Sequence, residues 1–173
     1  MGFKSKLAYR VLNSKLDSVS RDKKVFNLDT AATAGILWEI DQKDTFDRLK
    51  KELEEARIET NDLCYLPQKK AVVPEGVIGF TRKETHWSEV PKSEIAEKFI
   101  REKFDILIDL TGQKYFPIVY LTALSEAAFK IGYAGTQTNY FDLNIEFRET
   151  PEAGQLAEQI LYYLKRINKT TIE

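Results

Sequence analysis

Nearly continuous apolar runs mark the strands of a sheet that is covered on both faces. The clearest runs are Thr33–Ile40 and Phe104–Leu110, in which few polar residues interrupt the apolar ones. Runs of this kind are typical of parallel strands buried between two layers of helices. Shorter apolar segments at Asp62–Leu66 and Lys130–Tyr133 predict two more strands of the same sheet.

Two further segments predict strands at the edges of the sheet. Gly76–Thr81 follows the preceding strand after about ten residues, too few for a helical crossover, so we expect an edge or antiparallel strand. Phe141–Arg148 alternates apolar with polar residues, which is typical of a half-exposed strand at the opposite edge.

Helical patterns fill the intervals between these strands. They predict helices over residues 3–19, after a cap at Asp44, after Pro91, over Pro117–Phe129 and from the Thr150–Pro151–Glu152 start signal. The alternation of strands and helices predicts an α/β fold. We expect a three-layer sandwich on a mostly parallel, Rossmann- or flavodoxin-like sheet, preceded by an amphipathic helix.

Charge divides the chain into two parts. The 173 residues suit one domain. Residues 1–24 hold seven Lys or Arg and two Asp, a net charge of +5, whereas the remainder carries −6. We therefore assign residues 1–24 to a basic amphipathic helix and linker, and residues 25–173 to a single α/β domain. The overall charge of −1 does not favour a general nucleic-acid binder.

The basic face of the N-terminal helix has two interpretations. In the first, the helix packs on the domain and its charges are solvated. In the second, it binds an unknown protein or an anionic surface such as a membrane, and nucleic acid is the less favoured form of that partner. The side chains that would make this contact lie off the apolar stripe, at Lys4, Lys6, Arg10 and Lys15.

A ligand site is expected where the order of the strands reverses. Open α/β sheets bind ligands at the carboxyl ends of their strands at this point, and Thr33–Ile40 and Phe104–Leu110 are the expected neighbours there. The loop Thr111–Lys114 could offer backbone N–H groups and an ammonium to a phosphate, but we favour the interpretation that it is a polar turn in which Gly112 supplies an unusual dihedral angle. Residues 134–138 would close the crevice. Its predicted lining is Glu39, Asp41, Asp109, Thr111, Gly112, Gln113 and Lys114.

Catalytic chemistry is not indicated by any motif. The spacings of a P-loop and of a dinucleotide fingerprint are absent. One Cys and one His do not make a zinc site of the usual type, so we expect no metal and no cofactor. Asp109 is a candidate base or a capping residue, and His86 suits a surface loop. No segment approaches the ~20 apolar residues that span a bilayer, and the cytoplasm is the expected compartment.

One strand–helix–strand unit resembles a known family. Phe104–Leu110, Leu121, Ala123, Leu124 and Lys130–Tyr133 are similar to a unit in the N-terminal half of heptosyltransferase-type glycosyltransferases. Those enzymes use two such domains, and this chain has room for one. It also has Asp41–Asp44 in place of their first glycine-containing loop, so the resemblance implies a shared fold rather than transferase activity. Ser125–Gly132 and Phe141–Leu143 resemble a small uncharacterised α/β family of Bacteroidota.

These patterns support two hypotheses about function. We favour a non-catalytic cytoplasmic α/β domain that binds a macromolecular partner through its N-terminal helix. The alternative is a domain that binds a small ligand or a nucleotide-sugar and is related to half of a glycosyltransferase.

Overall fold

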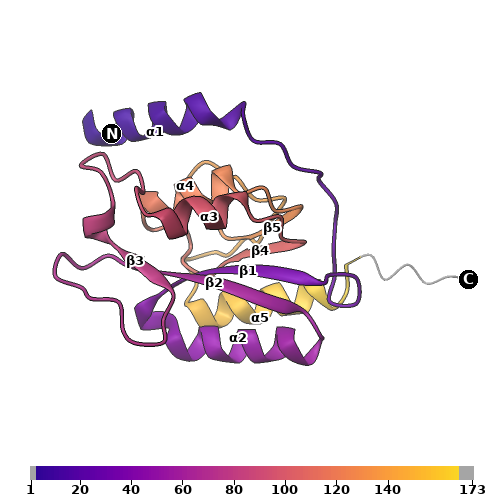
Figure 1. Ribbon diagram of the computed structural model, residues 1–173. Helices are drawn as coiled ribbons and strands as arrows, with labels where there is room; N and C mark the ends of the chain where they lie inside the picture. The colour runs from indigo at the N-terminus through magenta and orange to yellow at the C-terminus, as the bar shows by residue number, and fades with distance from the viewer. Residues whose placement is uncertain (1–2, 168–173) are drawn as a thin grey trace, which may run out of the picture.

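Six parallel strands form the centre of the molecule. The computed structural model describes residues 3–167 (Figure 1). The sheet order is β3-β2-β1-β4-β5-β6, and each adjacent pair is parallel. The α/β fold is thus confirmed, with a sheet that is wholly parallel over these residues. The strands are β1 (Thr33–Glu39), β2 (Glu59–Leu66), β3 (Gly79–Thr81), β4 (Ile106–Asp109), β5 (Phe129–Gly132) and β6 (Leu143–Asn144).

Helices cover both faces of this sheet. Helices α2 and α5 lie on one face, helices α3 and α4 lie on the other, and α1 lies outside α4 (Figure 1). Two short 3-10 helices, η1 (Ile40–Gln42) and η2 (Arg82–Glu84), follow β1 and β3. The α-helices are α1 (Phe3–Leu16), α2 (Lys43–Glu55), α3 (Glu94–Arg101), α4 (Phe116–Leu124) and α5 (Ala153–Leu164).

Successive residues of each central strand enter two separate cores. Ile36 and Trp38 face α2 and α5, and the Trp38 ring stacks on Phe46 with 4.2 Å between centroids. Leu37, between them, faces α3 and α4 together with Leu107. Because both faces are buried, neither side of the strand tolerates polar residues, which explains the continuous apolar runs.

The connection from β2 to β3 contains no helix. Twelve residues, 67–78, separate the two strands, yet β3 pairs parallel to β2 at the edge of the sheet. The expected position of this strand at the edge of the sheet is confirmed. The antiparallel pairing, which was the alternative, is not found. The loop crosses the α2 side of the sheet, where Ala71, Val73 and Val77 pack on the core. These side chains take the place of a crossover helix.

Helix α4 and strand β6 are shorter than the pattern predicted. Helix α4 ends at Leu124 rather than Phe129. The buried ammonium of Lys130 donates to the carbonyl oxygens of Thr122 and Ala123, at 2.8 and 3.0 Å, and so satisfies groups that a longer helix would use. Burial lowers the pKa of Lys130 to about 7. Strand β6 spans two residues, although the alternating pattern extends over eight.

Two helix starts also differ from their sequence signals. Helix α2 follows η1 directly, so Gln42 occupies the cap position and Asp44 lies in the first turn. Helix α5 begins at Ala153, one residue after Glu152, which shares a capping box with Gln155. Both shifts amount to one or two residues, which is the usual uncertainty of a helix boundary.

Helix α1 packs on the domain rather than standing free. Ala8 and Leu12, one turn apart, are 2% and 0% exposed, and Leu12 belongs to the core formed with α3 and α4. The Tyr9 ring meets the edge of Phe116 with 5.1 Å between centroids. These contacts make α1 part of the hydrophobic core.

Replacing Leu12 with alanine should lower the free energy of unfolding by about 2–4 kcal/mol, because the change leaves a cavity between α1 and α4. Urea denaturation measures the loss. Asn13→Ala, at an exposed neighbouring position of the same helix, is the matched control and should change stability little. Equal stability of the two variants would mean that α1 adds nothing to the fold.

Candidate functional site

The strand order reverses between β1 and β4, as the sequence predicted. These strands are direct neighbours, with Leu37 opposite Asp109. From β1 the chain continues through α2 on one face, and from β4 it continues through α4 on the other. The carboxyl ends of the two strands therefore open toward opposite layers, which is the arrangement that forms a crevice in doubly wound sheets.

The Gln42 side chain lies between the carboxyl ends of these two strands. Its Nε2 donates to the carbonyl oxygen of Leu110 at 3.1 Å, and its Oε1 accepts from the backbone N–H of Glu39 at 3.0 Å. The chain then enters α2 directly from η1. This first connection contains no glycine loop for a phosphate, and its polar side chain already bridges the two strands.

Asp109 binds its own loop and the following helix. The side chain is fully buried. One carboxylate oxygen accepts from the backbone N–H and the hydroxyl of Thr111, at 2.8 and 2.7 Å, and the other accepts from the Thr122 hydroxyl at 3.4 Å. Burial raises the pKa of Asp109 to about 6, against the opposing effect of these hydrogen bonds. The carboxylate thus connects β4 to α4 and does not pair with Lys114.

Glu39 is a buried carboxylate at the end of β1. It is 3% exposed, and its Oε1 lies 4.0 Å from the ammonium of Lys114 without a hydrogen-bond partner. Burial raises the pKa of Glu39 to about 7, although Lys114 acts in the opposite direction. Glu39 therefore changes charge near neutral pH, directly beneath the loop that carries Lys114.

Two consecutive residues of the β4–α4 loop have positive φ angles. Gly112 has φ of +65° and Gln113 has φ of +55°, so the predicted conformational role of Gly112 is confirmed. Glycine adopts this conformation without strain, whereas glutamine does so at a cost on the order of 1 kcal/mol or more. The Gln113 N–H donates to the Thr111 hydroxyl at 3.2 Å. The loop is thus held in the shape that turns Gln113 inward.

A groove of about 340 Å³ lies beside this loop, beneath the first turns of α1. Gln113 lines it and is 2% exposed, and its amide nitrogen and oxygen are closed to solvent without a hydrogen-bond partner. The Tyr9 and Phe116 rings contribute an aromatic part of the wall. The complete lining is Ser5, Ala8, Tyr9, Glu89, Gln113, Lys114, Phe116, Val119 and Gln137.

The structure brings only part of the predicted site to this groove. Gln113 and Lys114 line it, as does Gln137 from the segment predicted to close the crevice. The other predicted residues lie around it: Glu39, Asp109 and Thr111 are buried, Gly112 is half-buried, and Asp41 is exposed on η1. Sequence reasoning missed the other lining residues, because no local spacing shows that α1 covers this edge: they are Ser5, Ala8, Tyr9, Glu89, Phe116 and Val119.

Basic side chains remain on the outer surface of α1. Lys6 and Arg10 are exposed on this surface, whereas exposed Lys15 lies on the side of α1 that faces the domain, with its ammonium 5.5 Å from the centre of the buried Tyr120 ring. The side chain of Lys4, which also belongs to the predicted partner surface, lies outside the described part of the structure.

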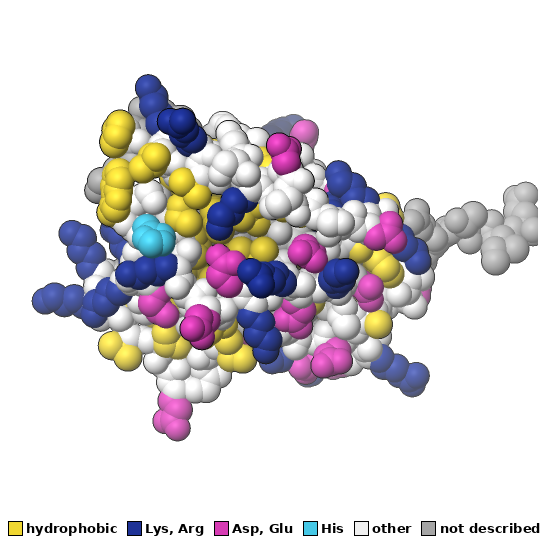
Figure 2. Space-filling model, turned by 45° about the horizontal axis from the view of Figure 1, so that its top comes forward, with side chains coloured by type: hydrophobic (Ala, Val, Ile, Leu, Met, Phe, Trp, Pro, Cys, Tyr) yellow, Lys and Arg dark blue, Asp and Glu magenta, His cyan; other side chains and the backbone are white. Residues whose placement is uncertain are grey.

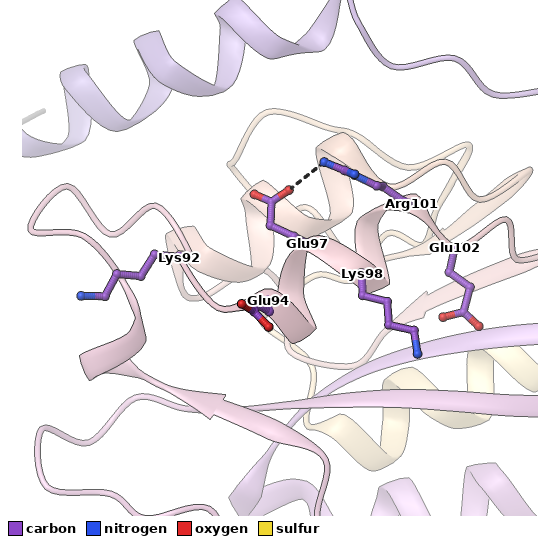
Figure 3. Close-up of a pocket in the computed structure, with 6 residues that line it drawn as sticks. All are labelled: Lys92, Glu94, Glu97, Lys98, Arg101 and Glu102. Carbon is purple, nitrogen blue, oxygen red and sulfur yellow. Dashed lines mark ion pairs between the residues drawn. The ribbon is translucent and has the colours of Figure 1, made fainter.

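A larger hollow, of about 570 Å³, lies along α3 (Figure 3). Its labelled side chains come from α3 and the residues flanking it, and Glu97 pairs with Arg101 at 4.0 Å. They project along the helix surface rather than toward a common point (Figure 3). This hollow is therefore a solvated helix face with less specific chemistry than the groove beside Gln113.

The other reactive side chains of residues 3–167 do not form a second candidate site. Cys64 is buried in β2, and burial raises its pKa to about 12, so the thiol stays protonated. His86 is exposed in the loop after η2. Within residues 3–167, His, Cys, Asp and Glu side chains do not gather in the groups of three or more that hold a metal ion.

Comparison with known proteins assigns the chain to one family. The wholly parallel sheet and its two helical layers define a doubly wound α/β domain. The chain belongs to the family described as "Family of unknown function (DUF6913)", which matches residues 4–167. No curated protein and no solved structure matches it. Among residues 3–167, no helix has both the length and the apolar character needed to cross a membrane.

Replacing Glu39 with glutamine should reduce the loss of stability between pH 5 and pH 8. In the wild type, the pKa of Glu39 is about 7 in the folded state. It is about 4.3 in the unfolded state. Folding therefore favours the protonated form, and this stabilisation is lost as pH rises through the folded pKa, by up to about 3 kcal/mol. Urea denaturation at the two pH values measures the effect.

Glu54→Gln, at an exposed position of α2, controls for the loss of a carboxylate alone. Asp109 is present in both Glu39→Gln and the wild type, so its contribution to the pH dependence of stability cancels when the two proteins are compared. Parallel pH profiles for the two proteins would contradict the raised pKa of Glu39.

Proposed function

We propose that this domain binds a small polar ligand in the groove between α1 and the β4–α4 loop. The observation that carries the proposal is the Gln113 amide, which is buried at the wall of the groove with neither polar atom paired. A buried polar group without a partner costs about 1–3 kcal/mol. A ligand with a donor and an acceptor side by side would satisfy both atoms at once.

The backbone of Gln113 supports the same role. Its φ of +55° is unfavourable for glutamine, and the conformation is held by the Thr111 hydroxyl and by the contacts of Asp109. Strained residues of this kind cluster at ligand-binding sites, where the surrounding structure fixes a side chain in advance. The loop thus fixes the amide behind the wall of the groove, where neither polar atom is open to solvent, so a ligand would reach it only when that wall shifts.

The remaining walls restrict the chemistry of the ligand. Phe116, Val119 and the Tyr9 ring offer an apolar surface, and Lys114 offers a positive charge. A molecule with a planar apolar part, an amide-like edge and an anionic group would contact all three. Nucleotides and nucleotide-sugars have these features, and their usual position in doubly wound folds is this edge of the sheet.

The proposal is binding rather than catalysis. Both oxygens of Asp109 are engaged inside the fold, and the candidate base does not line the groove. A relation to half of a heptosyltransferase-type enzyme is supported by the β4–α4–β5 unit alone, which forms a parallel crossover. Because Gln42 occupies the reversal point, the ligand position we propose lies on the α4 side of it.

Gln113→Met should abolish ligand binding and at the same time stabilise the free protein. Methionine has a similar volume and no amide, so it removes two unpaired polar atoms from a buried position, worth about 1–3 kcal/mol. Thermal-shift measurements with nucleoside monophosphates, nucleotide-sugars and sugar phosphates test binding, since an excess of a hundred times Kd stabilises by about 2.7 kcal/mol. Urea denaturation without ligand measures the stability.

Gln68→Met is the matched control, because Gln68 is exposed in the loop before β3. It should leave both ligand binding and stability close to wild type. A Gln113→Met protein that is less stable than wild type, together with no stabilisation of the wild type by any of these compounds, would contradict the proposed function.

A second candidate function is binding of a macromolecular partner through α1. It is supported by the position of Lys6 and Arg10, which are exposed on the side of the helix opposite to buried Ala8 and Leu12. This geometry leaves a basic face free while the helix packs on the domain.

Changing Lys6 and Arg10 together to glutamine should weaken recovery of an anionic partner by immobilised protein, and added salt should do the same to the wild type. Arg48→Gln with Lys51→Gln makes the same change of charge on exposed positions of α2, in the opposite layer. Partner recovery that is insensitive to salt and equal for the two double variants would exclude this surface.

A further inference from the structure

Two aromatic rings form an exposed pair at one end of the molecule. Phe3, at the start of α1, is 78% exposed, and Trp87, in the loop after η2, is 59% exposed. Their rings stack with 6.4 Å between centroids and 14° between planes. Large apolar side chains that gather on a surface mark an interaction site more often than isolated ones do.

Trp87 is displayed by a hydrogen-bonded turn. The His86 N–H donates to the Val90 carbonyl oxygen, and the Glu89 N–H donates to the His86 carbonyl oxygen, each at 2.8 Å. Thr85 and Pro91 pair as an antiparallel bridge at the base. The turn is thus fixed by its own backbone, and it holds an indole ring outward instead of burying it.

Positive charge surrounds this aromatic pair. Phe3, Lys6 and Arg10 are spaced three and four residues apart, which places them on one side of α1. Figure 2 shows hydrophobic side chains gathered beside the histidine, with Lys and Arg side chains around them. Lys92 is exposed in the same loop as Trp87, and Lys83 is exposed on η2 just before it.

Two acidic residues near Trp87 contact groups of the same segment of the chain. The Glu84 carboxylate accepts from the backbone N–H of Thr81 at 2.8 Å, and Glu89 lies 3.7 Å from Arg82. Both carboxylates keep their charge, but the basic residues near them are more numerous: Lys6, Arg10, Arg82, Lys83 and Lys92. The surface formed by Phe3, Trp87 and these basic side chains therefore presents aromatic rings within a net positive field.

We propose that this surface docks on a lipid bilayer that contains anionic phospholipids. Trp and Phe rings favour the interface between headgroups and acyl chains, and Lys or Arg side chains beside them are attracted to anionic headgroups. Because the apolar stripe of α1 is buried on the domain, the rings enter as a shallow tip and α1 does not insert along its length. The inference rests on the second candidate function and names its partner.

Tryptophan fluorescence provides the test, because the two tryptophans differ in their surroundings. Trp38 is 1% exposed and stacked on Phe46, so it does not sense a membrane. The full chain is mixed with vesicles of phosphatidylcholine alone, or of phosphatidylcholine and phosphatidylglycerol in equal parts. With the anionic vesicles, the emission should shift to shorter wavelength, and brominated acyl chains should quench it.

Variants connect this signal to the proposed surface. Trp87→Ala should lose both the shift and co-sedimentation with anionic vesicles. Lys6→Gln and Arg10→Gln should each weaken vesicle binding about fivefold, which corresponds to ~1 kcal/mol for each charge. Arg48→Gln with Lys51→Gln should bind as the wild type does.

Three outcomes would overturn the inference. The first is no shift with either kind of vesicle. The second is equal binding to neutral and anionic vesicles. The third is a shift that depends on protein concentration without vesicles, which would assign the surface to a second copy of the chain. Recovery of a protein partner that needs Lys6 and Arg10, without vesicle binding, would overturn the lipid inference and leave the second candidate function standing.

Discussion

The pairing of β1 with β4, buried on both faces, is the constraint on which the rest of this structure depends. Each strand supplies one set of side chains to α2 and α5 and the other set to α3 and α4. Polar groups are therefore excluded from the strand interiors and gather where the strands end. Gln42, Glu39, Asp109 and Gln113 all lie at that carboxyl edge or in the loops that leave it.

Much of the fold could be predicted from the sequence because burial on two faces leaves a strong local signal. The runs at Thr33–Ile40 and Phe104–Leu110 predicted the central strands and their adjacency, and both predictions are confirmed. The weaker predictions concerned features that depend on distant partners. Helix α4 stops at Leu124 because Lys130, in the next strand, binds its last carbonyl oxygens. A pattern within the helix carries no information about that contact.

The candidate site was also predictable only in part, for its local features and not for its long-range contacts. The loop Thr111–Lys114 was identified from its position after a buried strand, and the positive φ of Gly112 follows from its residue type. The inward amide of Gln113 and the aromatic wall supplied by Tyr9 were not predictable. Both depend on the packing of α1 against α4, which lies about a hundred residues further along the chain. Long-range placement of one helix thus decides where the groove lies.

The helix-free connection between β2 and β3 has a consequence for the way in which this molecule opens. Over residues 67–78 the α2 side of the sheet is covered by a loop, and its apolar contacts with the core come from Ala71, Val73 and Val77. Strand β3 also pairs through only three residues, at the edge of the sheet. Strand β6, at the opposite edge, pairs through two residues and also follows a connection without a helix. Fluctuations that expose backbone amides will therefore begin at these two edges and spread inward, and β1 and β4 will be the last to exchange with solvent. The expected result is a protected centre between two edges that exchange with solvent sooner.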